Sequence, residues 1–105
     1  MNKFGLWILI ITSIVLYGTF LSRVPVHLNQ DELGFSLNAY SIAKTGLDDN
    51  GTRMPVYFWH LGVMWATPIM TYLTAIVLVF LPLSEAVIRI PSVLIGTANV
   101  ILIWF

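Results

Sequence analysis

Asp31 and Glu32 stand side by side in the stretch LNQDELGFSLNAYSIAKTG, residues 28–46, between two long apolar segments. Neighbouring carboxylates can act as a general base or acid, and they can also cap a helix. The residues around them fit a helix start, because Asn29 followed three residues later by Glu32 has the pattern of a capping box. Spacing alone therefore leaves two interpretations open: a solvent-exposed helix cap, or an active site at a membrane surface.

The segment that follows the acid pair predicts a short helix over residues 30–45. Gly46 suits the position just beyond the end of such a helix. Apolar side chains would cover most of its surface, which is typical of a helix that lies on a membrane. A narrow polar stripe interrupts them and is expected to face water, with Asp31 at its head near the helix N-terminus, where the dipole favours an ionised carboxylate. The stripe comprises Asp31, Gly34, Asn38 and Ser41.

The remainder of the polar loop, which spans residues 23–62, offers weaker candidates. Residues 47–55, LDDNGTRMP, have turn chemistry, and their acids lack the full ligand spacing of a calcium loop, so no metal site is predicted. His60 is a lone histidine in an aromatic stretch. It fits either an interfacial residue bonded to backbone or water, or a phosphate-binding residue acting with Tyr57 and Arg53.

The composition is that of a membrane protein. Of the 105 residues, 58% are hydrophobic and only 10% are charged, against roughly 25% charged residues in ordinary globular chains. The formal net charge is zero, so nothing favours nucleic acid as a partner. The chain has no cysteine, which excludes disulfides and thiolate metal sites.

Three apolar runs predict three transmembrane helices, at about residues 4–22, 63–83 and 86–105. The first run is uncharged and spans roughly 28 Å as a helix, longer than the apolar region of a signal peptide. The second run has Pro68 early in it. Trp59 and Trp65 lie close to where it begins, as aromatic residues at a membrane interface do.

The third run follows a turn in which Ser84 is expected to cap the helix. Arg89 is expected to extend towards the lipid head groups, and Pro91 either kinks the helix or marks its first turn. The fold class predicted is thus an all-α membrane protein with a surface-lying helix in its first loop. Since the last run reaches Phe105 without a polar flank, residues 1–105 are expected to be the N-terminal fragment of a longer polytopic domain.

Several motifs occur together in one order: QDE opening the surface helix, NAYSIAKTG with DDNG after it, TPIMTYL, and RIPSVLIGTANVILIWF. In this combination the chain resembles the N-terminus of the GT-C type membrane glycosyltransferases. The resemblance is to the branch that contains the protein O-mannosyltransferases and the lipid A aminoarabinose transferases. It covers nearly the whole chain.

The resemblance implies a cytoplasmic N-terminus and an extracytoplasmic first loop, in a bacterial or archaeal plasma membrane. Charge counting alone leaves that orientation open. Lys3 and Glu85 are then expected on the cytoplasmic side, and Asp31 and Asp49 outside. Thr67 departs from the family, because some members have a basic residue there that meets the donor phosphate.

The implied function is transfer of a sugar from a polyprenyl-phosphate donor to a hydroxyl of an unknown acceptor, which is a protein, a lipid or a glycan. Asp31 would be the general base and Glu32 would share the catalytic site, while His60, Tyr57 and Arg53 are candidates for the donor phosphate. No cofactor is implied, and the fragment is expected to be inactive alone. The alternative is a non-enzymatic membrane protein, such as a transporter fragment or a small accessory subunit.

Overall fold

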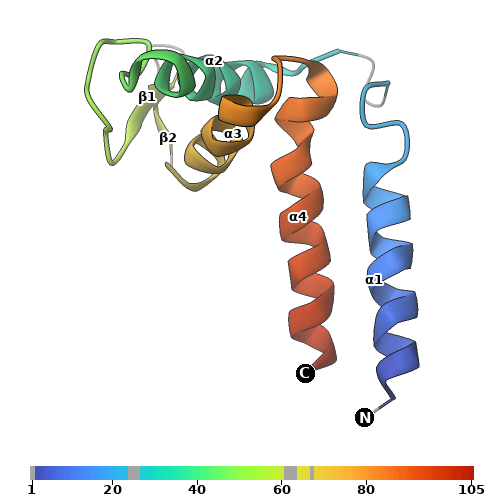
Figure 1. Cartoon of the computed structure of the whole chain (residues 1–105). Coiled ribbons are helices and arrows are strands. Elements are labelled where there is room, and N and C mark those ends of the chain that lie inside the picture. Colours follow the sequence, from blue (N-terminus) through green and yellow to red (C-terminus); the bar gives the residue numbers. More distant parts are fainter. Residues whose placement is uncertain (1, 24–26, 61–63, 67) are drawn as a thin grey trace.

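The computed structural model describes residues 2–23, 27–60, 64–66 and 68–105. These residues form a largely helical chain with one small β-hairpin. The helices are α1 (Lys3–Gly18), α2 (Gln30–Thr45), α3 (Pro68–Phe80) and α4 (Glu85–Trp104), and the strands are β1 (Phe58–His60) and β2 (Met64–Ala66). α1 and α4 lie side by side with both chain termini at one end, while α2, α3 and the hairpin gather at the other end (Figure 1).

The packing of α1 against α4 depends on glycines. A Cβ atom added to Gly96 would lie 3.0 Å from the ring of Tyr17, and one added to Gly5 would lie 3.2 Å from the ring of Trp104. Small residues at such positions let two helices approach closely, as is usual in membranes. The two helices run antiparallel, so the start of α1 lies beside the end of α4.

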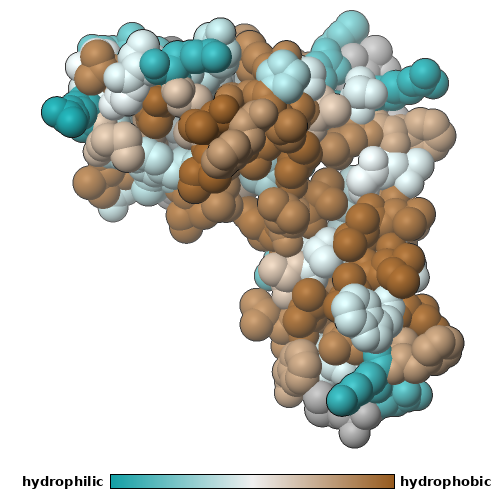
Figure 2. Space-filling view, viewed as in Figure 1, coloured by the Kyte–Doolittle hydropathy of each residue, from teal (hydrophilic) through white to brown (hydrophobic). Residues whose placement is uncertain are grey.

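Within the described residues, α4 is the one helix that is both long and apolar enough to cross a bilayer, judged by length and composition. α1 is apolar but has 16 residues, or about 24 Å. Hydrophobic residues cover the middle of the α1–α4 pair, and hydrophilic residues gather at its two ends (Figure 2). The structure thus supports a mostly helical protein with one candidate membrane span, rather than the three spans that the sequence predicts.

The structure does not support the predicted span at 63–83. Residues 64–66 belong to β2, and α3 has only 13 residues, or about 20 Å, against a hydrocarbon core of about 30 Å. Pro68 is the first residue of α3, where its missing N–H and fixed φ are tolerated. α3 packs against α2 instead of lying along α1 (Figure 1).

Because α3 does not cross between the two ends of the molecule, Glu85 does not lie at the same end as Lys3, where the three-span prediction would place it. Glu85 begins α4 at the end where α2 lies, whereas Lys3 lines a cavity with Trp104 and Phe105 at the opposite end (Figure 1). Glu85 is therefore on the side of Asp31, not on the side of Lys3. Ser84 caps α4 as predicted, accepting a hydrogen bond from the Val87 amide. Pro91 lies inside the helix and not in its first turn.

The predicted surface helix is confirmed as a helix with the predicted ends. The Glu32 amide donates to Asn29 Oδ1 at 2.7 Å, and the Asn29 amide donates to Glu32 Oε2 at 3.2 Å, which completes the capping box. Gly46 follows the helix with a φ of 75°, a left-handed conformation that glycine adopts without steric cost. Figure 1 shows α2 lying crosswise to α1 and α4.

Apart from Asp31, which is exposed, the polar stripe of α2 does not face water as predicted. Asn38 is 2% exposed and donates to the Gly34 carbonyl, while its Oδ1 accepts from the Asp49 amide. Ser41 donates to the Asp48 carbonyl. Asn38 and Ser41 therefore hydrogen-bond to the loop after the helix and anchor that loop.

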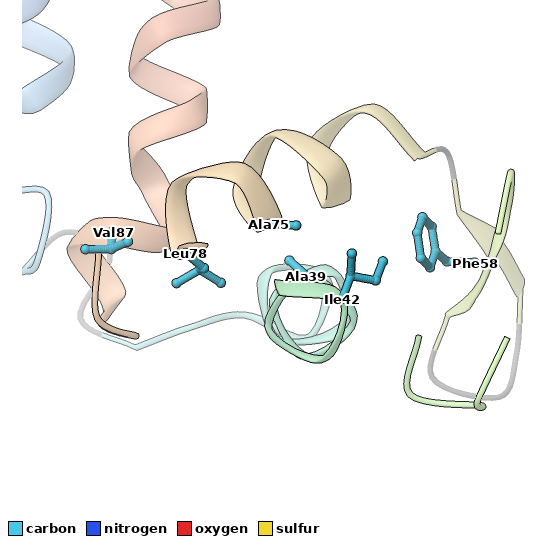
Figure 3. Packing of buried hydrophobic residues seen from close by; sticks show 6 residues of the cluster. All are labelled: Ala39, Ile42, Phe58, Ala75, Leu78 and Val87. Atoms are coloured by element: carbon cyan, nitrogen blue, oxygen red, sulfur yellow. The ribbon is translucent and has the colours of Figure 1, made fainter. Parts of the chain in front are cut away.

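The hairpin formed by β1 and β2 is the part of the fold that the sequence prediction missed, and it adds a small β element to the predicted all-α protein. The strands pair antiparallel with Trp59 opposite Trp65. Phe58 is 1% exposed and points from β1 towards α2, where it joins the core between α2, α3 and the start of α4 (Figure 3). The buried cluster comprises Ala39, Ile42, Phe58, Ala75, Leu78 and Val87.

Candidate functional site

Glu32 and Arg89 form an ion pair that joins the first turn of α2 to α4. Arg89 Nε lies 2.9 Å from Glu32 Oε1, and Nη2 lies 3.3 Å from Oε2. The exposed fraction is 6% for the Arg89 side chain and 18% for that of Glu32. This arrangement is nearly bidentate and largely shielded from water, so it fixes the angle at which α2 meets α4.

The same guanidinium also binds the segment that connects α1 to α2. Nη1 donates to the Leu21 carbonyl at 2.9 Å, and Nη2 donates to the His27 carbonyl at 3.5 Å. Arg89 therefore ties together the end of α1, the start of α2 and the first half of α4. It does not extend to the lipid head groups as the sequence predicts.

The ion pair changes the acid–base properties of Glu32. The hydrogen bond from Arg89 holds the pKa of the Glu32 carboxyl below its ordinary value, against the opposing effect of burial, and the Asn29 amide and the positive charge of Arg89 lower it further. Glu32 is thus an ionised carboxylate at neutral pH, and its oxygens are engaged by Arg89 and Asn29. These contacts suit a structural anion better than a proton acceptor.

Asp31 occupies a different environment although it is the adjacent residue. It is the second residue of α2 and its side chain is exposed. The helix cap is Asn29, so Asp31 does not serve as the cap. Of the two predicted catalytic acids, Asp31 is the one presented at the surface, on a helix start that Glu32 and Arg89 hold in place.

The other predicted site residues do not converge on the acid pair. Arg53 is exposed and its backbone pairs with Leu47, just beyond the end of α2. Tyr57 is 59% exposed. His60 is the last residue of β1. The first residue of this strand, Phe58, belongs to the same buried cluster as Ile42 of α2, so β1 lies near that part of α2.

Ile42 is eleven residues beyond Asp31 along α2, a distance of about 16 Å. The structure therefore separates the predicted base from the three residues predicted to hold phosphate. Thr67, the departure from the family pattern, lies outside the described residues.

A small cavity of about 190 Å³ adjoins the ion pair. Its walls come from α1, the turn after it, α2 and α4, and they are formed by Tyr17, Leu21, Glu32, Arg89, Ser92 and Val93. The cavity is below the roughly 300–1,000 Å³ of sites that enclose a whole small molecule. It has room for a short part of a ligand between α1 and α4.

Arg89 is the residue that sequence reasoning missed at this site. Its signal was present, because an arginine within an apolar run either reaches the interface or finds a buried partner. Its partner lies 57 positions away, which no local pattern reveals. Among the residues that the structure describes, no group of three or more histidine or acidic side chains is placed to hold a metal ion.

Comparison with known proteins adds no assignment to this geometry. No protein-family profile matches the chain. No curated protein matches it, and no solved structure is similar to it.

Proposed function

We propose that this chain is the N-terminal part of a GT-C type membrane glycosyltransferase that uses a polyprenyl-phosphate sugar donor. The observation that carries the proposal is the placement of Asp31: an exposed carboxylate on a rigidly anchored helix that lies across the end of an apolar helix pair. The resemblance of the motifs QDE, DDNG and RIPS to this family supports it. In this proposal Asp31 is the catalytic base, and Glu32 positions the helix that carries it.

The membrane position of Asp31 is supported by the distribution of apolar surface. α4 can cross a bilayer, and α1 lies antiparallel beside it (Figure 1). α3 adds a second indication, because its buried face includes threonines while its exposed face is aliphatic or aromatic. A helix with threonines on its buried face and apolar side chains on its exposed face suits contact of the exposed face with lipid. The exposed face comprises Ile69, Leu73, Ile76, Val79 and Phe80.

In the proposed reaction, Asp31 accepts the proton of the acceptor hydroxyl. The hydroxyl oxygen then forms a bond to the anomeric carbon of the donor sugar. The bond from that carbon to the phosphate oxygen breaks, and the polyprenyl phosphate leaves with the electron pair. The phosphate is a good leaving group, so one well-placed base can provide a typical acceleration of about 10²–10⁴.

Glu32 and Arg89 act in this proposal as positioning residues for Asp31. The cavity beside them is lined by residues of both α1 and α4, and the head of a lipid-linked donor would lie near it in this proposal. A lipid carrier explains why the base stands at the end of an apolar helix pair.

The test compares Asp31→Asn with Glu32→Gln in membranes that contain the full-length protein. Asp31→Asn is expected to lower sugar transfer from a polyprenyl-phosphate donor by about 10²–10⁴ while the protein still folds and inserts, since Asn29 and not Asp31 caps the helix. Glu32→Gln is expected to lower stability, because it weakens the ion pair. Near-normal turnover by Asp31→Asn would remove Asp31 from the mechanism and favour the non-enzymatic alternative.

The orientation is tested by cysteine labelling, for which the cysteine-free chain is well suited. Single cysteines at positions 31 and 85 are expected to react with an impermeant reagent from the same side, and a cysteine at position 3 from the other side. Labelling of positions 3 and 85 from one side would restore the three-span arrangement and contradict the structure.

A further inference from the structure

The β-hairpin has two chemically different faces. Phe58 of β1 turns inward, with its ring 5.5 Å from the ring of Tyr72 on α3. Trp59 and Trp65 are cross-strand partners on the outward face, with ring centroids 5.0 Å apart and nearly perpendicular planes. Side chains alternate along a strand, so burial of Phe58 fixes the outward direction of its neighbour Trp59.

The outward aromatic residues form one wall of a cavity of about 280 Å³. Tyr57, Trp59 and Trp65 contribute exposed ring surface, with exposed fractions of 59%, 38% and 66%. The loop after α2 forms the polar wall through Asp48, Asn50 and Thr52, and Pro55 completes the lining.

The polar wall is rigid because Asp48 organises it. Asp48 is 6% exposed, and its Oδ1 accepts hydrogen bonds from the amides of Asn50 at 3.0 Å and Thr52 at 2.7 Å. Pro55 is held from the other side, since its carbonyl accepts a hydrogen bond from the Tyr72 hydroxyl at 2.5 Å. The exposed side chains of Asn50 and Thr52 are thereby presented beside the aromatic rings, and they supply both donor and acceptor groups.

We propose that this cavity binds one ring of an uncharged saccharide. A pyranose has an apolar face of C–H groups, which packs on the electron-rich face of an aromatic ring, and a rim of hydroxyls, which pair with amide and hydroxyl groups. The cavity volume of about 280 Å³ lies just below the roughly 300–1,000 Å³ typical of small-molecule sites, which suits one sugar ring.

The charge of the lining selects against the phosphate end of a lipid-linked donor. Asp48 is the only charged residue among those that line the cavity, and a carboxylate disfavours a phosphate nearby. The cavity also lies at the hairpin end of α2, away from Asp31 in the first turn. It therefore suits a sugar of the acceptor that is several units from the reacting hydroxyl. The assignment of this cavity to the acceptor rests on the proposed function, and it implies that the acceptor is a glycan. Binding of an uncharged saccharide to the cavity does not depend on the proposed function.

The test measures saccharide binding to the protein in phosphatidylcholine nanodiscs. In a Trp7→Phe, Trp104→Phe background, only Trp59 and Trp65 report by fluorescence. Methyl α-mannopyranoside, methyl β-glucopyranoside and chitobiose are the probes, and mannose 1-phosphate is the charged comparison. We expect a saturable shift of tryptophan emission with at least one neutral probe, with a Kd of about 1–10 mM, and weaker binding of the phosphate.

Two variants test the two walls separately. Trp59→Ala and Asn50→Ala are each expected to weaken binding by about tenfold or more, while Tyr40→Ala, an exposed aromatic residue outside the cavity, leaves it unchanged. Asn50→Ala keeps the backbone amide that binds Asp48, so it preserves the loop. Circular dichroism of each variant establishes that the fold is retained.

Three results would overturn the proposal: no saturable response to any neutral probe, equal binding by Asn50→Ala and the parent protein, or quenching of Trp59 and Trp65 by brominated lipid instead of aqueous iodide. The last result would place the aromatic face in the bilayer. Saccharide binding that persists together with normal turnover by Asp31→Asn would retain this site and reject the proposed catalytic mechanism.

Discussion

The ion pair between Glu32 and Arg89 makes a quantitative prediction about the stability of the fold. Removing one partner of a buried pair typically costs about 3–5 kcal/mol, because the other charge stays buried without compensation. Glu32 is 18% exposed and can regain some water, so Arg89→Met is expected near the lower limit, at about 3 kcal/mol. That variant also removes the donors to the Leu21 and His27 carbonyls.

Glu32→Gln is expected to cost a similar amount for a different reason. The glutamine can still accept one hydrogen bond from Arg89 and can still complete the capping box with Asn29. It leaves the positive charge of a 6% exposed guanidinium without its counter-charge. The double variant should lose less than the sum of the two single losses, with a coupling energy of about 2–3 kcal/mol.

The assay is reversible unfolding of the purified protein in mixed micelles, followed by tryptophan fluorescence, for the wild type, both single variants and the double variant. Arg53→Met is the matched control, because Arg53 is an exposed arginine in the polar loop, and its loss should change stability by less than about 0.5 kcal/mol. Additive losses, or single losses below about 1 kcal/mol, would show that the pair is solvated and does not fix α2 against α4.

Three further predictions concern local features of the fold. The Arg89 guanidinium lowers the folded-state pKa of Glu32 below the ordinary value near 4.5. The ion pair therefore stabilises the protein above that pH, and this stabilisation is lost as the pH falls through the folded-state pKa. Unfolding measured across an acid titration should show the loss in the wild type and not in Glu32→Gln. Gly96→Leu should destabilise the protein by about 1–3 kcal/mol through overpacking, since even a Cβ atom at this position would lie 3.0 Å from the Tyr17 ring. Gly18→Ala is the control: a Cβ atom there meets nothing within 4 Å, so this variant should be neutral or stabilising in the same thermal unfolding experiment. Gly46→Ala should cost about 1–2 kcal/mol at its φ of 75°, and Gly46→Asn less; equal melting temperatures would contradict the left-handed cap.

The ends of α2 could be predicted because helix caps are local. Asn29, Glu32 and Gly46 act on backbone groups within a few residues of themselves, so their pattern in the sequence is enough to set both ends. The same holds for Ser84 at the start of α4. The exposed position of Asp31 beside the cap follows from the same local geometry.

The course of α3 could not be predicted in this way. Residues 63–83 are apolar enough to resemble a membrane span, and hydropathy does not distinguish a span from a shorter helix that packs on a neighbour. Contacts with α2 and with the start of α4 decide its direction, and that direction places Glu85 on the side of Asp31. The strand pairing of Trp59 with Trp65 likewise depends on partners, because a three-residue strand carries almost no periodic signal.

The composition and the local caps by themselves determined a mostly helical, strongly apolar chain with an acidic helix start between apolar segments. Only the tertiary structure decided what each acid does there. Arg89 reaches Glu32 across 57 positions and engages that carboxylate, while Asp31, one residue earlier, remains at the surface. The physical reason is that a buried charge requires a counter-charge. The arrangement of α2 and α4 in the fold determines that Glu32 supplies the counter-charge of Arg89.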